Sequence, residues 1–352
     1  WDGRKDVLLL IRDRLGIKPI YYADTDDGGI VFASELGAIR EAMPATSISP
    51  QAVAQYLTLL YIPAPRTIYQ GIRQLMPGQI LKDQGETRTI STYFDVTSLA
   101  KPAAAAPLAQ LQDQFRTGLK ECVGSHLISD VPLGLLLSGG LDSGSILAMM
   151  RSVSSGPIHT FSIGYKDGAD NDFNETSEAR AIAGRFGATH TEEFLSPDVT
   201  ELLPKIVEAM GEPFADSSAI VTYLVAGVAR KSVTVALSGI GGDELFGGYP
   251  RYMGIQLGKH YSALPASVRA AIATHVAPLL AERGSHRDQR GRIRRFLQNG
   301  ALPLSSQYAN WISFIPPDWT DMIFADDFSK EIDVRAPFEI LEGYFRNWPS
   351  LN

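Results

Sequence analysis

The spacing of apolar and polar residues changes character part-way along the chain. In the first 92 residues, short apolar runs alternate with turn residues, which is typical of strands joined by tight turns. The turn at 24–29 is rich in Asp and Gly and predicts a hairpin. Ser49 followed by Pro50 predicts an N-cap and the start of a helix that runs to residue 61. The pattern also predicts strands at 7–11, 20–23 and 29–33, a short helix at 34–39 and a last strand at 80–82.

From residue 131 onwards, apolar runs with the length of buried strands alternate with helical patterns. An amphipathic helix at 108–128 precedes them. Such alternation predicts an α/β fold, a doubly wound parallel sheet with helices on both faces. Beyond residue 250 the pattern is helical, and Trp311, Phe314 and Trp319 are expected to pack in that helical part. The strands are expected at 131–137, 158–163, 188–194 and 232–237, and the helices at 143–151, 175–186, 198–210 and 217–229.

The first of these buried strands ends in the run Ser138-Gly139-Gly140-Leu141-Asp142-Ser143. Glycines permit a tight turn and a close approach to a ligand, and the first amides of the following helix would face the same point as the two serines. This pattern predicts an anion site, with an ordinary strand-to-helix turn as the alternative. It is not a Walker loop, because no Gly-Lys-Ser/Thr follows, and the dinucleotide fingerprint is also absent.

A second glycine-rich loop, at 238–243, also follows a buried strand and carries Asp243. In parallel sheets ligands bind beyond the carboxyl ends of the strands, where the loops 138–143, 164–174 and 238–243 would meet. Either aspartate alone is more typical of a helix cap. Asp142 and Asp243 at one sheet edge, beside a phosphate loop, instead predict a shared Mg²⁺ ion.

Composition and charge narrow the function classes. The chain of 352 residues is long enough for two domains, and the prolines of 100–107 mark a linker between them. A net charge of −7 disfavours a nucleic-acid partner, and no apolar run has the length of a membrane span. Cys122 is the one cysteine, so no cysteine metal cluster is expected, and the cytoplasm is the default location. The basic stretch 283–295 is interpreted as a solvated helix face.

The charged loop at 12–19 lies between two predicted strands. Two interpretations stay open from its chemistry. It is either a solvated hairpin end, or a loop in which Asp13 binds a cationic amino group.

Taken in order, these motifs resemble the glutamine-hydrolysing asparagine synthetase family over nearly the whole chain. The loops at 138–143 and 238–249 contribute most to the likeness. The other segments that carry it are Arg12 to Pro19, Phe32 to Glu35, Pro65 to Tyr69, Leu75 to Gly78, Thr160 to Gly164 and Glu212 to Ser218.

The resemblance implies three segments. These are the C-terminal part of an α+β N-terminal-nucleophile glutaminase domain at 1–92, a linker at 93–107, and an ATP pyrophosphatase-type domain at 108–352 that is incomplete at its C-terminus. It implies an ATP-dependent ligase that adenylates aspartate on its β-carboxyl group and lets ammonia from glutamine displace AMP, giving asparagine, AMP and pyrophosphate. ATP and Mg²⁺ would be the cofactors, and the substrates would be aspartate or another carboxylic acid, with glutamine. A homodimer stays open.

The residue roles carried over from the family are as follows. Asp142 and Asp243 match the magnesium carboxylates, and Asp13 matches a residue that holds the amino group of glutamine. The ATP-binding set comprises Leu136, Ser138, Gly139, Gly140, Leu141, Asp142, Ser143, Ile163, Ser238 and Gly239.

The chain departs from the family in three places. Residue 1 is Trp, where the family's catalytic cysteine begins the mature enzyme, so this piece of a longer protein is not expected to hydrolyse glutamine. The family's catalytic lysine would follow residue 352, so the catalytic residues are left unassigned. Ile240 stands where asparagine synthetases commonly carry an acidic residue, which makes it the candidate residue of the acceptor site.

Three other functions stay open at this point. An amidotransferase or cyclase of the same family could act on another carboxylic acid, which the Ile240 departure favours. A catalytically silent nucleotide-binding paralogue is disfavoured by the intact loop. Sulfur transfer to tRNA is disfavoured by the single cysteine and the negative net charge.

Overall fold

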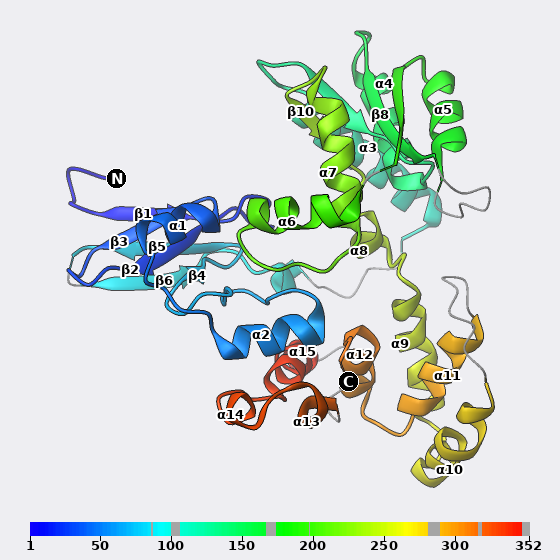
Figure 1. Cartoon of the computed structure of the whole chain (residues 1–352). Helices are drawn as coiled ribbons and strands as arrows, with labels where there is room; N and C mark the ends of the chain where they lie inside the picture. Colours follow the sequence, from blue (N-terminus) through cyan, green and yellow to red (C-terminus); the bar gives the residue numbers. More distant parts are fainter. Residues whose placement is uncertain are drawn as a thin grey trace. The chain divides into compact units, whose positions relative to one another are not determined.

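The computed structural model describes residues 1–85, 87–99, 106–166, 174–196, 198–280, 289–315 and 319–346. The chain forms two compact units, shown in Figure 1. Unit 1 comprises Trp1–Lys101, Val207–Asp216 and Tyr249–Asn352, and unit 2 comprises Pro102–Ile206 and Ser217–Gly248. Residues 100–105 of the predicted linker lie outside the described part of the chain.

The described residues of unit 1 form two antiparallel sheets of three strands each, with strand orders β1-β5-β6 and β3-β2-β4. The predicted hairpin is confirmed, because β2 pairs with β3 and the amide of Thr25 donates to the carbonyl of Gly29 at 3.1 Å. The strands are β1 (Leu8–Ile11), β2 (Tyr21–Asp24), β3 (Ile30–Ala33), β4 (Arg73–Gln74), β5 (Gln79–Asp83) and β6 (Arg88–Thr92).

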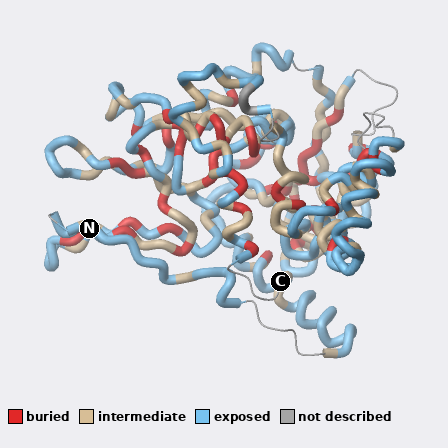
Figure 2. The backbone as a smooth tube through the Cα atoms, turned by 90° about the horizontal axis from the view of Figure 1, so that it is seen from below, coloured by how far each residue is buried: buried red, intermediate tan, exposed pale blue. Residues whose placement is uncertain are grey.

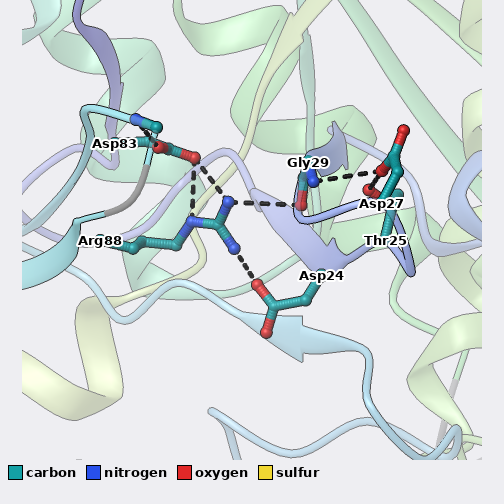
Figure 3. Close-up of polar contacts among 7 residues, drawn as sticks. Asp24, Thr25, Asp27, Gly29, Asp83 and Arg88 are labelled. Atoms are coloured by element: carbon teal, nitrogen blue, oxygen red, sulfur yellow. Dashed lines mark hydrogen bonds and ion pairs between the residues drawn. The ribbon is translucent and has the colours of Figure 1, made fainter.

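Arg88 joins the two sheets of unit 1 through its guanidinium group (Figure 3). Its Nε and Nη2 donate to Oδ2 of Asp83 at 2.9 and 2.6 Å, within the first sheet. Its Nη1 donates to Oδ1 of Asp24 on β2, and its Nη2 also donates to the carbonyl of Gly29 at 3.3 Å. One cation therefore neutralises the buried Asp83 and ties β5 and β6 to the β2–β3 hairpin.

The helices of unit 1 come from both ends of the chain. The predicted N-cap is confirmed, because Ser49 Oγ accepts a hydrogen bond from the amide of Ala52 at 3.3 Å. Helix α2 packs against α12 and α15 through Leu59, Ala309, Phe338 and Leu341. Figure 2 colours the backbone of the chain by burial, with buried residues in red. The helices are α1 (Leu36–Ala42), α2 (Pro50–Leu59), α9 (Pro250–Tyr261), α10 (Ala266–Ala271), α11 (Gln289–Asn299), α12 (Leu304–Ile312), α13 (Thr320–Ile323), α14 (Asp326–Ser329) and α15 (Ala336–Arg346), with shorter helical turns η1 (Val96–Leu99), η2 (Ile272–Val276) and η3 (Ala277–Leu279).

Unit 2 is built on a parallel sheet with the strand order β10-β7-β8-β9, as the alternating pattern predicted. Its strands are β7 (Leu133–Leu136), β8 (His159–Tyr165), β9 (Thr189–Leu195) and β10 (Val235–Leu237). Its helices are α3 (Leu108–His126), α4 (Leu141–Val153), α5 (Thr176–Arg185), α7 (Ser218–Arg230) and α8 (Gly242–Phe246), and α6 (Val199–Met210) leads from unit 2 into unit 1.

Helices cover both faces of this sheet, which confirms the doubly wound α/β class. On one face, Leu135 and Leu137 form a core with residues of α3, α4 and α5, among them the fully buried Leu147. On the other face, Leu136 and Phe161 pack against residues of α7. Successive residues of β7 therefore point to opposite cores, as expected of a strand buried on both sides.

Two expectations about unit 1 were wrong. The strand at 80–82 is not the last one, because β6 follows it and pairs with β5. Strand β6 lacks apolar alternation because it is an exposed edge strand, and backbone pairing rather than burial defines it. Phe314 and Trp319 are also not packed in the helical part, since they are 70% and 55% exposed. Trp311 does pack there, stacked on Phe296 with 5.9 Å between ring centroids.

Candidate functional site

Two of the predicted loops meet at the carboxyl edge of the sheet in unit 2. The chain runs from β7 to β8 and β9 on one side, and then returns to place β10 on the other side of β7. The strand order reverses between β7 and β10, and ligands of open α/β sheets bind at such a switch point. The loops that follow these two strands are 137–140 and 238–241. Residues 167–173 of the predicted third loop lie outside the described residues.

The first loop is held closed by its two serines. The hydroxyl groups of Ser138 and Ser143 are 2.9 Å apart, and the amide of Ser138 donates to Ser143 Oγ at 3.1 Å. The amide of Gly140 in turn donates to Ser138 Oγ at 3.2 Å. These bonds fix the turn between β7 and α4, so the start of the helix is preorganised.

The first turn of α4 leaves amide donors free. Its N-cap residue is Gly140, which has no side chain to cap the helix. Within the described part of the chain, the amides of Leu141, Asp142 and Ser143 have no hydrogen-bond acceptor, and the amide of Gly144 donates to the carbonyl of Gly140. Three free donors at a helix N-terminus can bind an anion such as a phosphate group.

The second loop lies directly against this helix start. A Cβ atom at Gly239 would lie 2.7 Å from the backbone nitrogen of Ser143 and 3.2 Å from Cβ of Asp142. A Cβ atom at Gly242 would collide with the carboxylate of Asp142. Gly241 adopts a φ of +102°, which favours glycine, and lets the loop turn into α8. The glycines of the second loop therefore allow the close contact between the two loops.

The carboxylates of Asp142 and Asp243 belong to these two touching loops. The carboxylate of Asp142 lies against Gly242, the residue before Asp243, and that of Asp243 lies beside Gly248. Neither carboxylate has a hydrogen bond or an ion pair with another residue that the structure describes. Those residues also contain no group of three or more His, Cys, Asp or Glu side chains able to hold a metal alone. Carboxylate oxygens without a protein partner are the type of ligand that Mg²⁺ prefers, with phosphate and water as its other ligands.

Glu175 is a residue of this site that the sequence reasoning missed. Its Oε2 accepts a hydrogen bond from the amide of Gly139 at 3.2 Å. The side chain of the residue that precedes α5 therefore contacts the first loop. Gly139 is packed closely there, since a Cβ atom would lie 2.6 Å from Cβ of Glu178. Only the position of Glu175 at the start of a helix at the same sheet edge could have indicated this contact.

Five other predicted site residues differ in their environment. Leu136 and Ile163 are half-buried, with side chains packed against the α7 core. Ser238 Oγ accepts a hydrogen bond from the amide of Ile240 at 3.3 Å and stabilises the second loop. Ile240 itself is 86% exposed, so its side chain is available to a ligand rather than used in packing. Leu141, the fifth of this group, is 84% exposed at the helix start.

Asp13 lies in unit 1, in the loop between β1 and β2. Its Oδ1 accepts from the amides of Leu15 and Ile17, both at 3.1 Å, and its Oδ2 accepts from the amide of Lys18 at 3.2 Å. Desolvation raises the pKa of the Asp13 carboxyl, but these amide hydrogen bonds together lower its pKa below the ordinary value. The loop joins two different sheets, so it is not a hairpin end.

Comparisons with known sequences agree with this geometry. A family profile described as asparagine synthase matches residues 114–322, which include both loops of unit 2. The chain belongs to the asparagine synthase family. A second profile, described as a glutamine amidotransferase domain, matches residues 1–94.

Several curated relatives carry the corresponding name. The chain is 33% identical over 311 residues to an asparagine synthetase (glutamine-hydrolysing) of Bacillus subtilis, covering 88% of this chain and 46% of the relative. It is 35% identical to a protein provisionally named as such an enzyme in Methanocaldococcus jannaschii, covering 72% of this chain and 49% of the relative. A third relative, also provisionally named, is from Mycobacterium bovis, with 32% identity over 91% of this chain and 50% of the relative. The chain thus spans about half the length of the curated relatives that it matches.

Proposed function

We propose that the protein carrying this chain is an ATP-dependent ligase that makes asparagine from aspartate, glutamine and ATP. The observation that carries the proposal is the first loop, a preorganised turn with three free amides, in contact with a second loop that bears an aspartate. This arrangement suits the binding of a pyrophosphate group. Membership of the asparagine synthase family supports the same chemistry.

Each residue of the loops has a role in this proposal. The amides of Leu141, Asp142 and Ser143, with the hydroxyl of Ser138, would bind the departing pyrophosphate and offset its negative charge. Asp142 and Asp243 would hold a Mg²⁺ ion, which neutralises phosphate charge when it is bound. The aspartate β-carboxylate would attack the α-phosphorus of ATP, and ammonia would then release AMP. Leu136, Ile163 and Gly239 would line the nucleotide site, and in unit 1 Asp13 would hold the amino group of glutamine.

The test is product analysis with the natural protein that contains this chain. Incubated with Mg²⁺-ATP, glutamine and aspartate labelled with ¹⁸O in its β-carboxyl group, it should give asparagine and pyrophosphate, and AMP that carries one ¹⁸O atom. The label reaches AMP only if a carboxyl oxygen becomes bonded to the α-phosphorus. Release of ADP and inorganic phosphate, or AMP without the label, contradicts the proposal.

A matched pair of variants tests the metal assignment by a binding measurement. Asp243→Asn should weaken the Mg²⁺-dependent binding of ATP to this chain by about tenfold or more, because the site loses one of two protein carboxylates. Asp113→Asn, which makes the same change at an exposed position of α3, should leave binding unchanged. If ATP binding depends on Mg²⁺ equally in both variants, Asp243 is not a ligand of the metal.

A second candidate function is amide formation or cyclisation on another carboxylic acid. The exposed Ile240 favours it, because an apolar side chain can neither accept a proton nor pair with a cationic group near the acceptor. A panel of carboxylic acids in the same assay separates the two candidates. Pyrophosphate release with another acid and not with aspartate favours the second. A cytoplasmic location and a homodimer remain predictions that accompany both candidates.

A further inference from the structure

Unit 1 contains a groove of about 880 Å³ that none of the loops described above lines. Its walls come from α2, from the turn between Pro63 and Met76, and from the segment that ends in α15. The walls are fixed to each other. Gln51 Nε2 donates to the carbonyl of Asp333 at 2.9 Å, and the amide of Asp333 donates to Gln51 Oε1 at 2.7 Å. The cavity is therefore preformed in the folded unit.

One wall of the groove carries two arginines that lie opposite each other. Arg66 and Arg73 form an isolated antiparallel β-bridge, and directly opposite residues of such a bridge have their side chains on the same face. Like charges placed this way repel each other. Neither guanidinium has an ion pair or a hydrogen bond with another described residue, in contrast to Arg88 of the same unit. Two free guanidinium groups on one face can together bind a carboxylate.

The other wall of the groove carries negative charge. Glu331 and Glu339 line it, and both are exposed. Neither carboxylate has a partner among the described residues, whereas the neighbouring Glu342 is 3.9 Å from Arg335. The groove thus presents unpaired charges of both signs on separate walls.

Gln55 adds a polar group that is buried and without a partner. It lies on α2, lines the groove and is only 1% exposed. Its Oε1 is buried with no hydrogen-bond donor within reach among the described residues. A buried acceptor left unpaired is destabilising, so a ligand that donates an N–H group to it would relieve that cost.

We propose that this groove binds a zwitterionic α-amino acid. Its carboxylate would pair with Arg66 and Arg73, and its ammonium group would pair with Glu331 and Glu339. Gln55 Oε1 would accept one N–H of the ligand. All of these residues belong to unit 1, and the inference is independent of the proposed ligase chemistry in unit 2.

The experiment is a calorimetric titration of this chain, without nucleotide, with each of the standard L-amino acids. At least one should bind with a dissociation constant below about 1 mM. Arg73→Gln and Glu339→Gln should each weaken that binding by about tenfold or more, because each removes one charge partner of the zwitterion. Gln55→Leu should also weaken it. Arg116→Gln, on an exposed position of α3 in unit 2, makes the same change of charge and should leave the affinity unaltered.

Modified probes separate a zwitterion site from a simple anion site. The N-acetyl derivative of the bound amino acid lacks the ammonium group, and its methyl ester lacks the carboxylate, so both should bind more weakly than the free amino acid. The proposal is overturned if no amino acid binds at about 10 mM. It is equally overturned if inorganic phosphate or the N-acetyl derivative binds as tightly, or if Arg73→Gln and Glu339→Gln change nothing while circular dichroism shows the parent fold.

Discussion

Glu212 carries a carboxyl group whose protonation is coupled to folding. Burial raises its pKa above the ordinary value of 4.5, and the hydrogen bond from the amide of Ile68, at 3.0 Å, opposes this only in part. The folded state therefore holds this proton more tightly than the unfolded state does. Stability from this group is fully present below the unfolded pKa, and it is lost as the pH rises through the folded pKa.

The variant Glu212→Gln tests this coupling. Glutamine keeps an oxygen that can accept from the amide of Ile68, but it does not titrate and avoids the cost of burying a charge. The free energy of unfolding of the variant should fall less steeply than that of the parent as the pH rises from about 4.5 towards neutrality. Urea titrations across this pH range measure it. Parallel pH profiles for the two proteins would show that the carboxyl group does not contribute.

Gly239 packs against the start of α4, and Gly144 lies within its first turns. An added methyl group should change the stability of the protein in opposite directions at these two glycines. Gly239→Ala places a Cβ atom 2.7 Å from the backbone nitrogen of Ser143. The hydrogen-bonded turn holds this nitrogen in place, so it cannot move away from the new atom. We expect a loss of about 1–3 kcal/mol in stability and a weaker affinity for ATP. In Gly144→Ala the new atom meets Ile182 at an ordinary 3.7 Å inside α4, so a gain of about 0.5–1 kcal/mol is expected.

Thermal unfolding and ATP titration of both variants check this pair. Gly144→Ala serves as the control for the chemical change itself. If Gly239→Ala is as stable as the parent and binds ATP equally well, the two loops do not make the close contact described above.

At the scale of elements, Arg88 should contribute far more to stability than its exposed partner Asp24. Arg88→Met leaves the carboxylate of Asp83, whose side chain is 10% exposed, with the amide of Gly85 as its remaining partner. Breaking a buried pair in this way costs about 3–5 kcal/mol. Asp24→Asn should cost only about 0–1 kcal/mol, because the side chain of Asp24 is 68% exposed. Chemical denaturation of both variants measures the difference, and equal losses would contradict this account of the network.

The elements of unit 2 could be predicted from the sequence because each carries its own signal. Apolar runs buried on both faces mark β7 and β8, and the glycines after β7 and β10 mark the turns that the loops require. Strand β6 carries no such signal, since its residues face solvent and only its pairing with β5 defines it. The contact of Glu175 with Gly139 depends on how α5 is placed after folding, which no local pattern encodes.

The roles of individual polar residues were harder to predict than their positions. Asp13 was expected to hold an amino group, and its two oxygens already accept three backbone amides of their own loop. Its carboxylate can still face a ligand, so the expected role remains a prediction. The turn at 138–140 was easier to predict, because its glycines and serines determine the backbone locally, and its phosphate chemistry remains a prediction.

At the scale of the whole molecule, the chain crosses between its two units more than once. The segment Val207–Asp216 belongs to unit 1 although both of its neighbours in sequence belong to unit 2. Two hydrogen bonds hold it there. The amide of Ile68 donates to Oε2 of Glu212, and the amide of Ala215 donates to the carbonyl of Leu60, both at 3.0 Å. The C-terminal helices also join unit 1, where the amide of Phe314 donates to the carbonyl of Thr58 at 2.7 Å. Such groupings depend on contacts between residues distant in sequence, so composition alone could not predict them.

Each unit has its own buried core, and this predicts that the two lose structure separately. Leu147 is fully buried in the core of unit 2, and Ile39 is fully buried in that of unit 1. Truncating either side chain to alanine should cost about 2–5 kcal/mol, through lost burial and the cavity that remains.

In hydrogen exchange followed by mass spectrometry, Leu147→Ala should reduce protection in the strands of unit 2 and leave β1, β2 and β5 unchanged. Ile39→Ala should give the reverse pattern. Mg²⁺-ATP should restore protection in Leu147→Ala alone, because a ligand stabilises only the unit that binds it. Equal loss of protection in both units, from either variant, would mean that the chain unfolds as one cooperative body.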